Sequence, residues 1–194
     1  LPHYFMKTND KWKIYSDAEL FTMLSGTQLE IDGSFHELYR RYSVRIYGYC
    51  RRMVGDGAAE DVCQDIFLSF LDHGKKKTPI NNVAAYLFRI AQNKTRRQRS
   101  NEVERTMEEF KEELFSASNL SPEERETNQL VSSAMELLPD DYRETLALQV
   151  YGGMTYEEIA AVRRVPITTV RNHILRAKKK IRELLLPFFQ DESK

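Results

Sequence analysis

Apolar residues recur every three to four positions along most of this chain, which is the spacing of amphipathic helices. The clearest stretch covers residues 35–53, with apolar side chains at Phe35, Leu38, Tyr39, Tyr42, Ile46, Tyr49, Cys50 and Met53. It predicts a helix of about five turns. The sequence Gly55-Asp56-Gly57 then interrupts the pattern.

Shorter apolar stripes of the same period follow at residues 62–71 and 83–91, and we expect them to pack with the first helix in one domain. A second set lies at residues 130–138, 146–150, 159–162 and 170–184. Glycine and proline are scarce, with 8 and 6 positions among 194, which favours helices. The pattern therefore predicts an all-α protein with two small helical domains.

Helix starts are indicated by Ser or Thr followed three residues later by Glu, because the two side chains can satisfy each other's free amides. We predict helix starts at four such pairs: Ser16 with Glu19, Ser34 with Glu37, Ser121 with Glu124, and Thr155 with Glu158.

An acidic segment separates the two sets of stripes. Residues 101–126 contain nine glutamates and three basic residues, and the sequence SASNLSP at 116–122 is typical of flexible loops. We expect an N-terminal tail at residues 1–15, a first domain at 16–100, a flexible acidic linker at 101–121 and a second domain at 122–194.

Composition narrows the class of protein. With 41% hydrophobic and 30% charged residues, the chain is too apolar for a disordered protein and too polar for a membrane protein. The pattern shows neither a spanning segment nor a secretory signal, so we expect a cytoplasmic protein. Cys50 and Cys63 fit neither a disulfide framework nor a zinc site, and we expect two buried free thiols and no cofactor or metal.

Two local clusters of positive charge stand out, although 29 basic and 29 acidic residues cancel overall. Residues 89–99 contain five basic side chains and no acid, and residues 163–182 contain eight and no acid. One such cluster alone is usually a solvated face. Two clusters that flank an acidic linker indicate nucleic-acid binding, because Lys and Arg neutralise phosphates.

The second cluster also fits a helix-turn-helix. The sequence TYEEIA at 155–160 opens a short helix, residues 161–165 can turn, and PITT at 166–169 starts a second helix. Val170 and Ile174 should face inward. In this geometry the first residues of the second helix meet base edges and later ones meet phosphates. We expect base contacts from Thr168, Thr169, Arg171, Asn172 and His173, and phosphate contacts from Arg176, Lys178 and Lys179. The same spacing also fits a pair of helices that is unrelated to the helix-turn-helix motif.

Three stretches together resemble a known family. They are FHELYRRY at 35–42 with AEDVCQDIFL at 59–68, AYLFRIAQN at 85–93, and the segment from LPDDYR at 138–143 to Leu185. In order and spacing they resemble the extracytoplasmic-function (ECF) group of the sigma-70 family, which are bacterial RNA polymerase initiation factors.

The resemblance implies partners and site residues. The AEDxxQxxF helix of the family docks on the clamp helices of the largest polymerase subunit, which assigns core-polymerase binding to Asp61, Gln64, Asp65 and Phe67. The second stretch implies reading of the minus-ten element and promoter melting by Tyr86, Arg89, Asn93, Lys94, Arg96 and Arg97. The helix-turn-helix would read the minus-thirty-five element.

Further partners are implied in the same way. They are the polymerase flap, double-stranded and melted promoter DNA, and an anti-sigma factor that in many members is membrane-bound; no small-molecule substrate is implied. The linker would let the two domains close on each other or spread along a promoter.

Several of these residues also fit a purely structural role. Asp61 and Asp65 fit a solubilising surface, Tyr86 is in register with Ile90 and fits a core position, and Asn93 fits a helix end.

The chain also departs from the family pattern. Arg97 stands where Asp is usual, and Arg163-Arg164 replaces a Leu-Gly pair at the turn. Without glycine, a turn with positive φ costs about 1 kcal/mol, or the turn takes another shape. Thr168, Asn172 and His173 also differ from the residues that are frequent in the family. The bases that relatives recognise therefore do not predict the bases that this chain recognises.

Other functions compete with a promoter-specificity subunit. A stand-alone helix-turn-helix regulator would use DNA but not polymerase, and a helical adaptor would use neither. An enzyme is disfavoured because the four histidines are scattered and no nucleophile motif or phosphate-binding glycine loop occurs.

Overall fold

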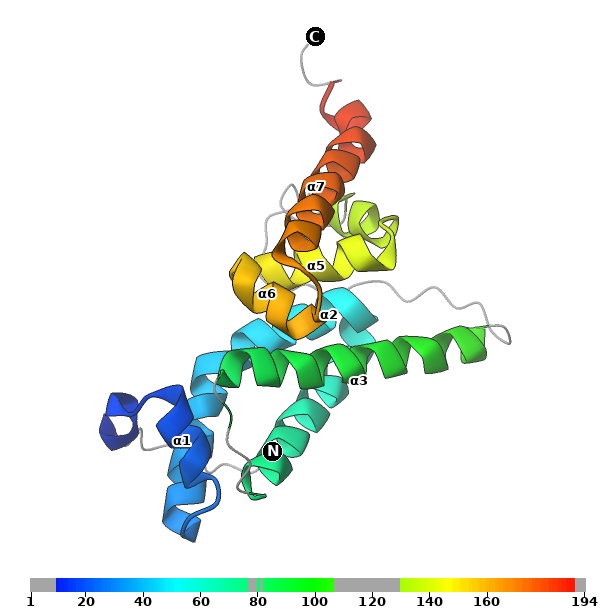
Figure 1. Cartoon of the computed structure of the whole chain (residues 1–194). Coiled ribbons are helices and arrows are strands. Elements are labelled where there is room, and N and C mark those ends of the chain that lie inside the picture. Colours follow the sequence, from blue (N-terminus) through cyan, green and yellow to red (C-terminus); the bar gives the residue numbers. More distant parts are fainter. Residues whose placement is uncertain (1–9, 77–79, 81, 107–129, 191–194) are drawn as a thin grey trace.

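The computed structural model describes residues 10–76, 80, 82–106 and 130–190, and within these ranges the regular structure is entirely helical. The elements are η1 (Asp10–Ile14), α1 (Asp17–Met23), α2 (Gln28–Gly74), α3 (Val83–Thr106), a helical stretch at residues 130–136, α5 (Asp140–Val150), α6 (Tyr156–Arg163) and α7 (Ile167–Gln190). The predicted all-α class is confirmed (Figure 1).

Two of the four predicted helix starts are confirmed. Ser16 and Thr155 each form a capping box with the Glu three residues later. The start predicted at Ser34 is wrong, because Thr27 and Glu30 make the same capping box about two turns earlier. Ser34 is buried inside α2 and donates to the Ile31 carbonyl at 3.3 Å. The Ser121 pair lies outside the described residues.

Helix α2 bends at Gly55, in agreement with the predicted interruption. Gly55 has φ 74° and ψ 172°, a backbone conformation that glycine adopts without a steric penalty. The bend turns α2 into two arms, which form a V in Figure 1. Tyr39 on the first arm and Phe67 on the second have ring centroids 4.7 Å apart.

The core of this N-terminal part lies between the two arms of α2, α1 and α3. Its fully buried side chains include Leu20, Leu38, Ile46, Ile66, Phe70, Leu87 and Phe88. Cys50 and Cys63 are buried free thiols there, as expected. Residues 10–15, which the sequence assigned to a tail, belong to the fold because Trp12 is buried against α2 and Arg41 donates to the carbonyls of Lys13 and Tyr15.

The C-terminal part places α7 across α5 and α6. Val170 and Ile174 are buried, as predicted, with Leu148, Ile159 and Val162. At the turn before α7, Arg164 has φ 56° and ψ 44°. The turn therefore keeps the left-handed conformation although the chain has no glycine there.

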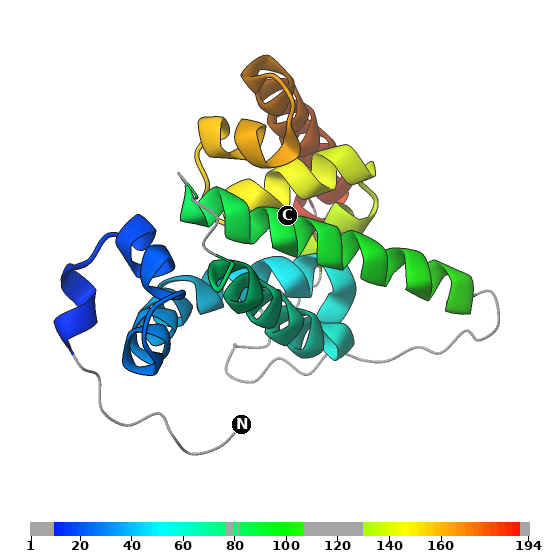
Figure 2. The ribbon, with the colours of Figure 1, turned by 60° about the horizontal axis from the view of Figure 1, so that its bottom comes forward.

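Helix α3 lies between the two parts. Figure 2 shows α3 passing over α2 on one side and meeting α5 and α6 on the other, and α2 also contacts α5. Its backbone continues to Thr106, beyond the first-domain boundary predicted at residue 100. No helix among the described residues is long and apolar enough to cross a membrane.

Candidate nucleic-acid and polymerase interface

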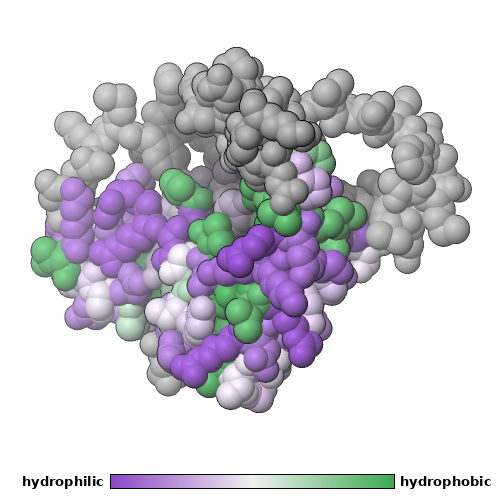
Figure 3. Space-filling model, turned by 90° about the horizontal axis from the view of Figure 1, so that it is seen from above, coloured by the Kyte–Doolittle hydropathy of each residue, from purple (hydrophilic) through white to green (hydrophobic). Residues whose placement is uncertain are grey.

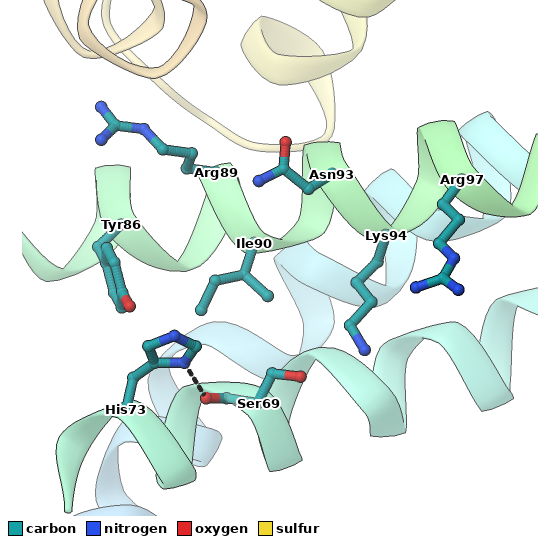
Figure 4. Close-up of a pocket in the computed structure, with 8 residues that line it drawn as sticks. All are labelled: Ser69, His73, Tyr86, Arg89, Ile90, Asn93, Lys94 and Arg97. Carbon is teal, nitrogen blue, oxygen red and sulfur yellow. Dashed lines mark hydrogen bonds between the residues drawn. The ribbon is translucent and has the colours of Figure 1, made fainter. Parts of the chain in front are cut away.

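A pocket of about 330 Å³ lies between the second arm of α2 and α3. It is lined by Ser69, His73, Tyr86, Arg89, Ile90, Asn93, Lys94 and Arg97 (Figure 4). Five of these residues belong to the six that the sequence assigned to minus-ten DNA. The helical spacing of α3 brings them together, because residues three and four apart share a face.

The aromatic wall of the pocket is formed by Tyr86 and His73. Their rings meet at 76° with centroids 5.9 Å apart, and His73 Nδ1 lies 2.6 Å from the Ser69 carbonyl. Tyr86 is half-buried and its ring also packs on Phe21 and Phe70. Tyr86 thus serves the core on one side and the pocket on the other.

The polar wall of the pocket carries the amide of Asn93 and the cations of Lys94 and Arg97. Asn93 is exposed, and in Figure 4 the Lys94 side chain points down from α3 towards α2. Burial raises the pKa of Tyr86, so its hydroxyl stays protonated at neutral pH and can donate a hydrogen bond. An aromatic face, amide groups and cations together suit an unstacked base and its phosphates.

Two of the six predicted residues are directed elsewhere. Arg89 points away from Ser69 and His73 in Figure 4, and its Nη2 donates to the Ala161 carbonyl at 2.9 Å. Arg96 does not line the pocket, and its Nη2 lies 2.7 Å from Glu144 Oε2.

The residues predicted to bind polymerase divide into a surface and its support. Asp61, Gln64 and Asp65 are exposed on the second arm of α2, and Asp65 lies 3.6 Å from Lys94 Nζ. Phe67 is only 3% exposed and packs against the Tyr39 ring, so it supports the second arm from the core and does not extend into solvent.

Sequence reasoning missed one residue of this face. Leu68 is 51% exposed, and it follows Asp61 by seven positions and Gln64 by four. That spacing puts it on the same side of the helix as the carboxylates. The signal was present, but an exposed leucine cannot be told from a buried one by periodicity alone.

The predicted DNA-reading residues lie on α7. Thr168, Arg171, Asn172, Arg176, Lys178 and Lys179 are exposed, and Thr169 is half-buried. The view from above in Figure 3 shows hydrophilic side chains over much of the coloured surface, interspersed with apolar ones.

His173 is placed differently from its predicted role. Its ring is half-buried against Tyr142, with centroids 5.1 Å apart, and Nδ1 lies 3.2 Å from Arg163 Nη1. Burial, followed by the nearby Arg163 charge, lowers the pKa of His173, so the ring is neutral at neutral pH. This environment suits a residue that supports α7 better than one that extends into a groove.

No cluster of three or more His, Cys, Asp or Glu side chains that could hold a metal ion occurs in the part of the chain that the structure describes.

Comparison with known proteins decides the family. The family described as Sigma-70 region 2 matches residues 38–103, and Sigma-70, region 4 matches residues 128–181. The ECF RNA polymerase sigma-E factor of Escherichia coli (strain K12) is 30% identical over 171 residues, which cover 81% of this chain and 89% of that protein. The chain belongs to the sigma-70 family. Its similarity to the sigma-E factor places it in the ECF group.

The two sigma-70 matches fall on the two parts of the structure. Region 2 contains most of α2, the pocket and the exposed carboxylates, whereas region 4 contains α5, α6 and the part of α7 up to residue 181. The resemblance seen in the sequence is therefore confirmed, together with the order of its motifs.

Solved structures support the fold. The structure of the sigma factor RpoE with the anti-sigma factor NepR from Bartonella quintana has a TM-score of 0.63 at 25% identity, and covers 78% of this sigma-70 family chain and 96% of that chain. The structure of CnrH in complex with the cytosolic domain of CnrY has a TM-score of 0.66 at 24% identity, and covers 92% and 100%.

Proposed function

We propose that this sigma-70 family member is a promoter-specificity subunit that binds core RNA polymerase, recognises promoter DNA and helps to open it, with no reaction of its own. The observation that carries this proposal is the pocket between α2 and α3, whose lining includes Tyr86, Asn93 and Lys94. Strand opening needs a site that holds an unstacked base beside its backbone, and this pocket has the side chains for it.

The polymerase contact is assigned to the exposed face of Asp61, Gln64, Asp65 and Leu68. Carboxylates around an exposed apolar side chain suit a basic helical partner such as the clamp helices of the largest subunit. Phe67 supports this face from the core. The polymerase flap is proposed as a second contact, made by the C-terminal part.

The duplex contact is assigned to α7. Thr168, Thr169, Arg171 and Asn172 are placed at its N-terminal end, where a recognition helix meets base edges. Arg176, Lys178 and Lys179 follow and suit phosphates. His173 is proposed as a support for this helix.

The remaining assignments rest on the same family membership. Residues 16–100 and 122–194 are proposed as the two functional domains, and the protein is proposed to work in the cytoplasm. The relative RpoE was solved with an anti-sigma factor, so an anti-sigma factor is also proposed as a partner here.

The test is binding to purified core polymerase. The variant Asp61→Ala/Gln64→Ala/Asp65→Ala is compared with wild type and with Gln28→Ala/Asp32→Ala, which removes the same residue types from an exposed face at the other end of α2. We expect tight binding by wild type and by the control, and loss of binding in the triple variant, with unchanged helix content in all three.

Other outcomes favour the competing functions. DNA binding without polymerase binding by the wild type would indicate a stand-alone helix-turn-helix regulator. Failure of both would indicate a helical adaptor.

A further inference from the structure

Three arginines on one face of α3 make hydrogen bonds or salt bridges to the C-terminal part. Arg89 donates to the Ala161 carbonyl at 2.9 Å, Arg96 Nη2 lies 2.7 Å from Glu144 Oε2, and Arg99 Nη2 lies 2.8 Å from Asp140 Oδ1. Residues 89, 96 and 99 are seven and three positions apart, so they share one side of the helix. Arg89 and Arg96 were assigned to promoter DNA from the sequence.

Two further arginines extend this contact from α2. Arg45 Nε donates to the Gly152 carbonyl at 2.6 Å. Arg52 Nη2 donates to the Ser132 carbonyl at 2.8 Å and lies 3.3 Å from Glu136 Oε1. In all five cases the N-terminal part supplies the cation and the C-terminal part supplies the oxygen.

The acceptor side is built around the first turns of α5. Glu144 is only 3% exposed, and its carboxylate also lies 3.5 Å from Arg163 Nη2 and 3.4 Å from the Tyr49 hydroxyl. The hydrogen bond from Arg99, partly offset by burial, lowers the pKa of Asp140. Both carboxylates face arginine side chains, Asp140 through Arg99 and Glu144 through Arg96 and Arg163.

Resting on the function proposed above, we propose that Glu136, Asp140 and Glu144 act as an internal competitor for DNA. They occupy arginines of α2 and α3 in the manner of phosphates and hold the chain in a closed state. The closed state must open before Arg89 and Arg96 can contact the promoter backbone.

The exposed part of the contact, made by Asp140 and Glu136, is weak enough to be displaced. The side chains of Asp140 and Glu136 are 72% and 64% exposed, and exposed ion pairs contribute only about 0 to 1 kcal/mol each. Arg89 Nε is buried without a hydrogen-bond partner, so this arginine is incompletely satisfied in the closed state. A strand of DNA offers many phosphates and releases counterions when it binds, which favours exchange.

The test uses the full chain and the variant Glu136→Gln/Asp140→Asn. Glu144 is left intact because it is buried and also contacts Arg163 within the C-terminal part. The control, Glu157→Gln/Glu183→Gln, changes the total charge equally at exposed positions on α6 and α7. Small-angle scattering gives the radius of gyration, and a labelled single-stranded DNA oligonucleotide of mixed sequence reports binding.

We expect the Glu136→Gln/Asp140→Asn variant to have a larger radius of gyration and to bind the oligonucleotide roughly five- to tenfold more tightly than wild type, as expected from the loss of two exposed pairs. The control should keep the wild-type radius. Equal radii for wild type and variant would overturn the closed state. An equal gain in affinity by the control would overturn the competitor, because net charge alone would then explain the gain.

The proposed function is tested separately through polymerase binding by the exposed face of Asp61, Gln64, Asp65 and Leu68 (the Asp61 face), which does not include Glu136, Asp140 or Glu144. Retained polymerase binding with no difference between wild type and variant overturns the internal competitor alone. A larger radius without any oligonucleotide binding by either protein overturns its competition with DNA and the DNA role proposed for α3.

Discussion

The indole of Trp12 lies so close to Gly33 that a Cβ atom at Gly33 would be 2.0 Å from Trp12 Cε2. This contact fixes η1 on the first arm of α2, since it leaves no room for any side chain at residue 33. It also explains why residues predicted to form a tail are part of the fold.

We therefore expect Gly33→Ala to lower the free energy of unfolding by about 1 to 3 kcal/mol through overpacking, although alanine favours helices. Trp12 is the single tryptophan of the chain, so its fluorescence reports the change directly. The emission should shift to the red and become easier to quench. Gly57→Ala is the control: a Cβ there meets nothing within 4 Å, and a gain of roughly 0.5 to 1 kcal/mol is expected. An unchanged Trp12 spectrum in Gly33→Ala would contradict the contact.

Glu37 should make the stability depend on pH in the acid range. Hydrogen bonds from Arg40 first, opposed by burial, and then from Arg41 lower the pKa of Glu37 from 4.5 to about 2. Because the folded pKa is depressed, the stabilisation is present above about pH 4.5 and is lost as the pH falls towards 2. The shift corresponds to roughly 3 kcal/mol.

Denaturant unfolding at several pH values checks this expectation. Glu37→Gln should remove most of this contribution and flatten the dependence between pH about 4.5 and 2. Glu60→Gln changes an exposed carboxyl on the same helix and should keep the wild-type slope. If both variants kept that slope, Glu37 would not be its source.

Arg164 carries a backbone cost that a substitution can release. Its φ of 56° lies in the left-handed region, which side chains with a Cβ disfavour. We expect Arg164→Gly to raise the free energy of unfolding by about 0.5 to 1 kcal/mol, after the larger entropy of glycine in the unfolded chain is subtracted. Arg164→Ala separates the effect of the backbone from that of the lost charge. Equal stability of the two variants would refute the strain.

Arg171 should read sequence rather than only bind phosphate. It is exposed near the start of α7, and Arg can make two hydrogen bonds to guanine. Arg171→Ala is expected to weaken binding to a selected promoter duplex by about 1 to 3 kcal/mol, with little effect on random DNA. Arg182→Ala, three turns further along α7, serves as the matched control and should weaken both equally if it contacts DNA at all. Equal losses on both duplexes for Arg171→Ala would assign Arg171 to phosphate.

Local signals predicted much of the fold correctly. The bend at Gly55 and the capping boxes at Ser16 and Thr155 depend on residues within one turn of each other, which sequence reasoning can see. The start at Ser34 failed because two boxes, at Thr27 and Ser34, compete within one helix. Propensity alone does not choose between them.

The site was predicted in type but not in arrangement. Helical spacing grouped Tyr86, Asn93 and Lys94 on α3, but the contact of the Tyr86 ring with His73 on α2 comes from tertiary packing. The pairing of Arg96 with Glu144 joins residues of different domains, and no local pattern predicts it. His173 was likewise expected to be exposed, but its ring packs against Tyr142.

The bend at Gly55 also bears on how the protein is made. It brings the two arms of α2 together through residues close in sequence, and such local contacts form quickly. N-terminal units generally fold first during synthesis, so the core of α1, α2 and α3 can form before α5 leaves the ribosome. A nascent chain would then display its Asp61 face and its α3 arginines while Asp140 and Glu144 are still untranslated. In each molecule the α3 arginines would therefore be accessible before the carboxylates of α5 that pair with them have been synthesised.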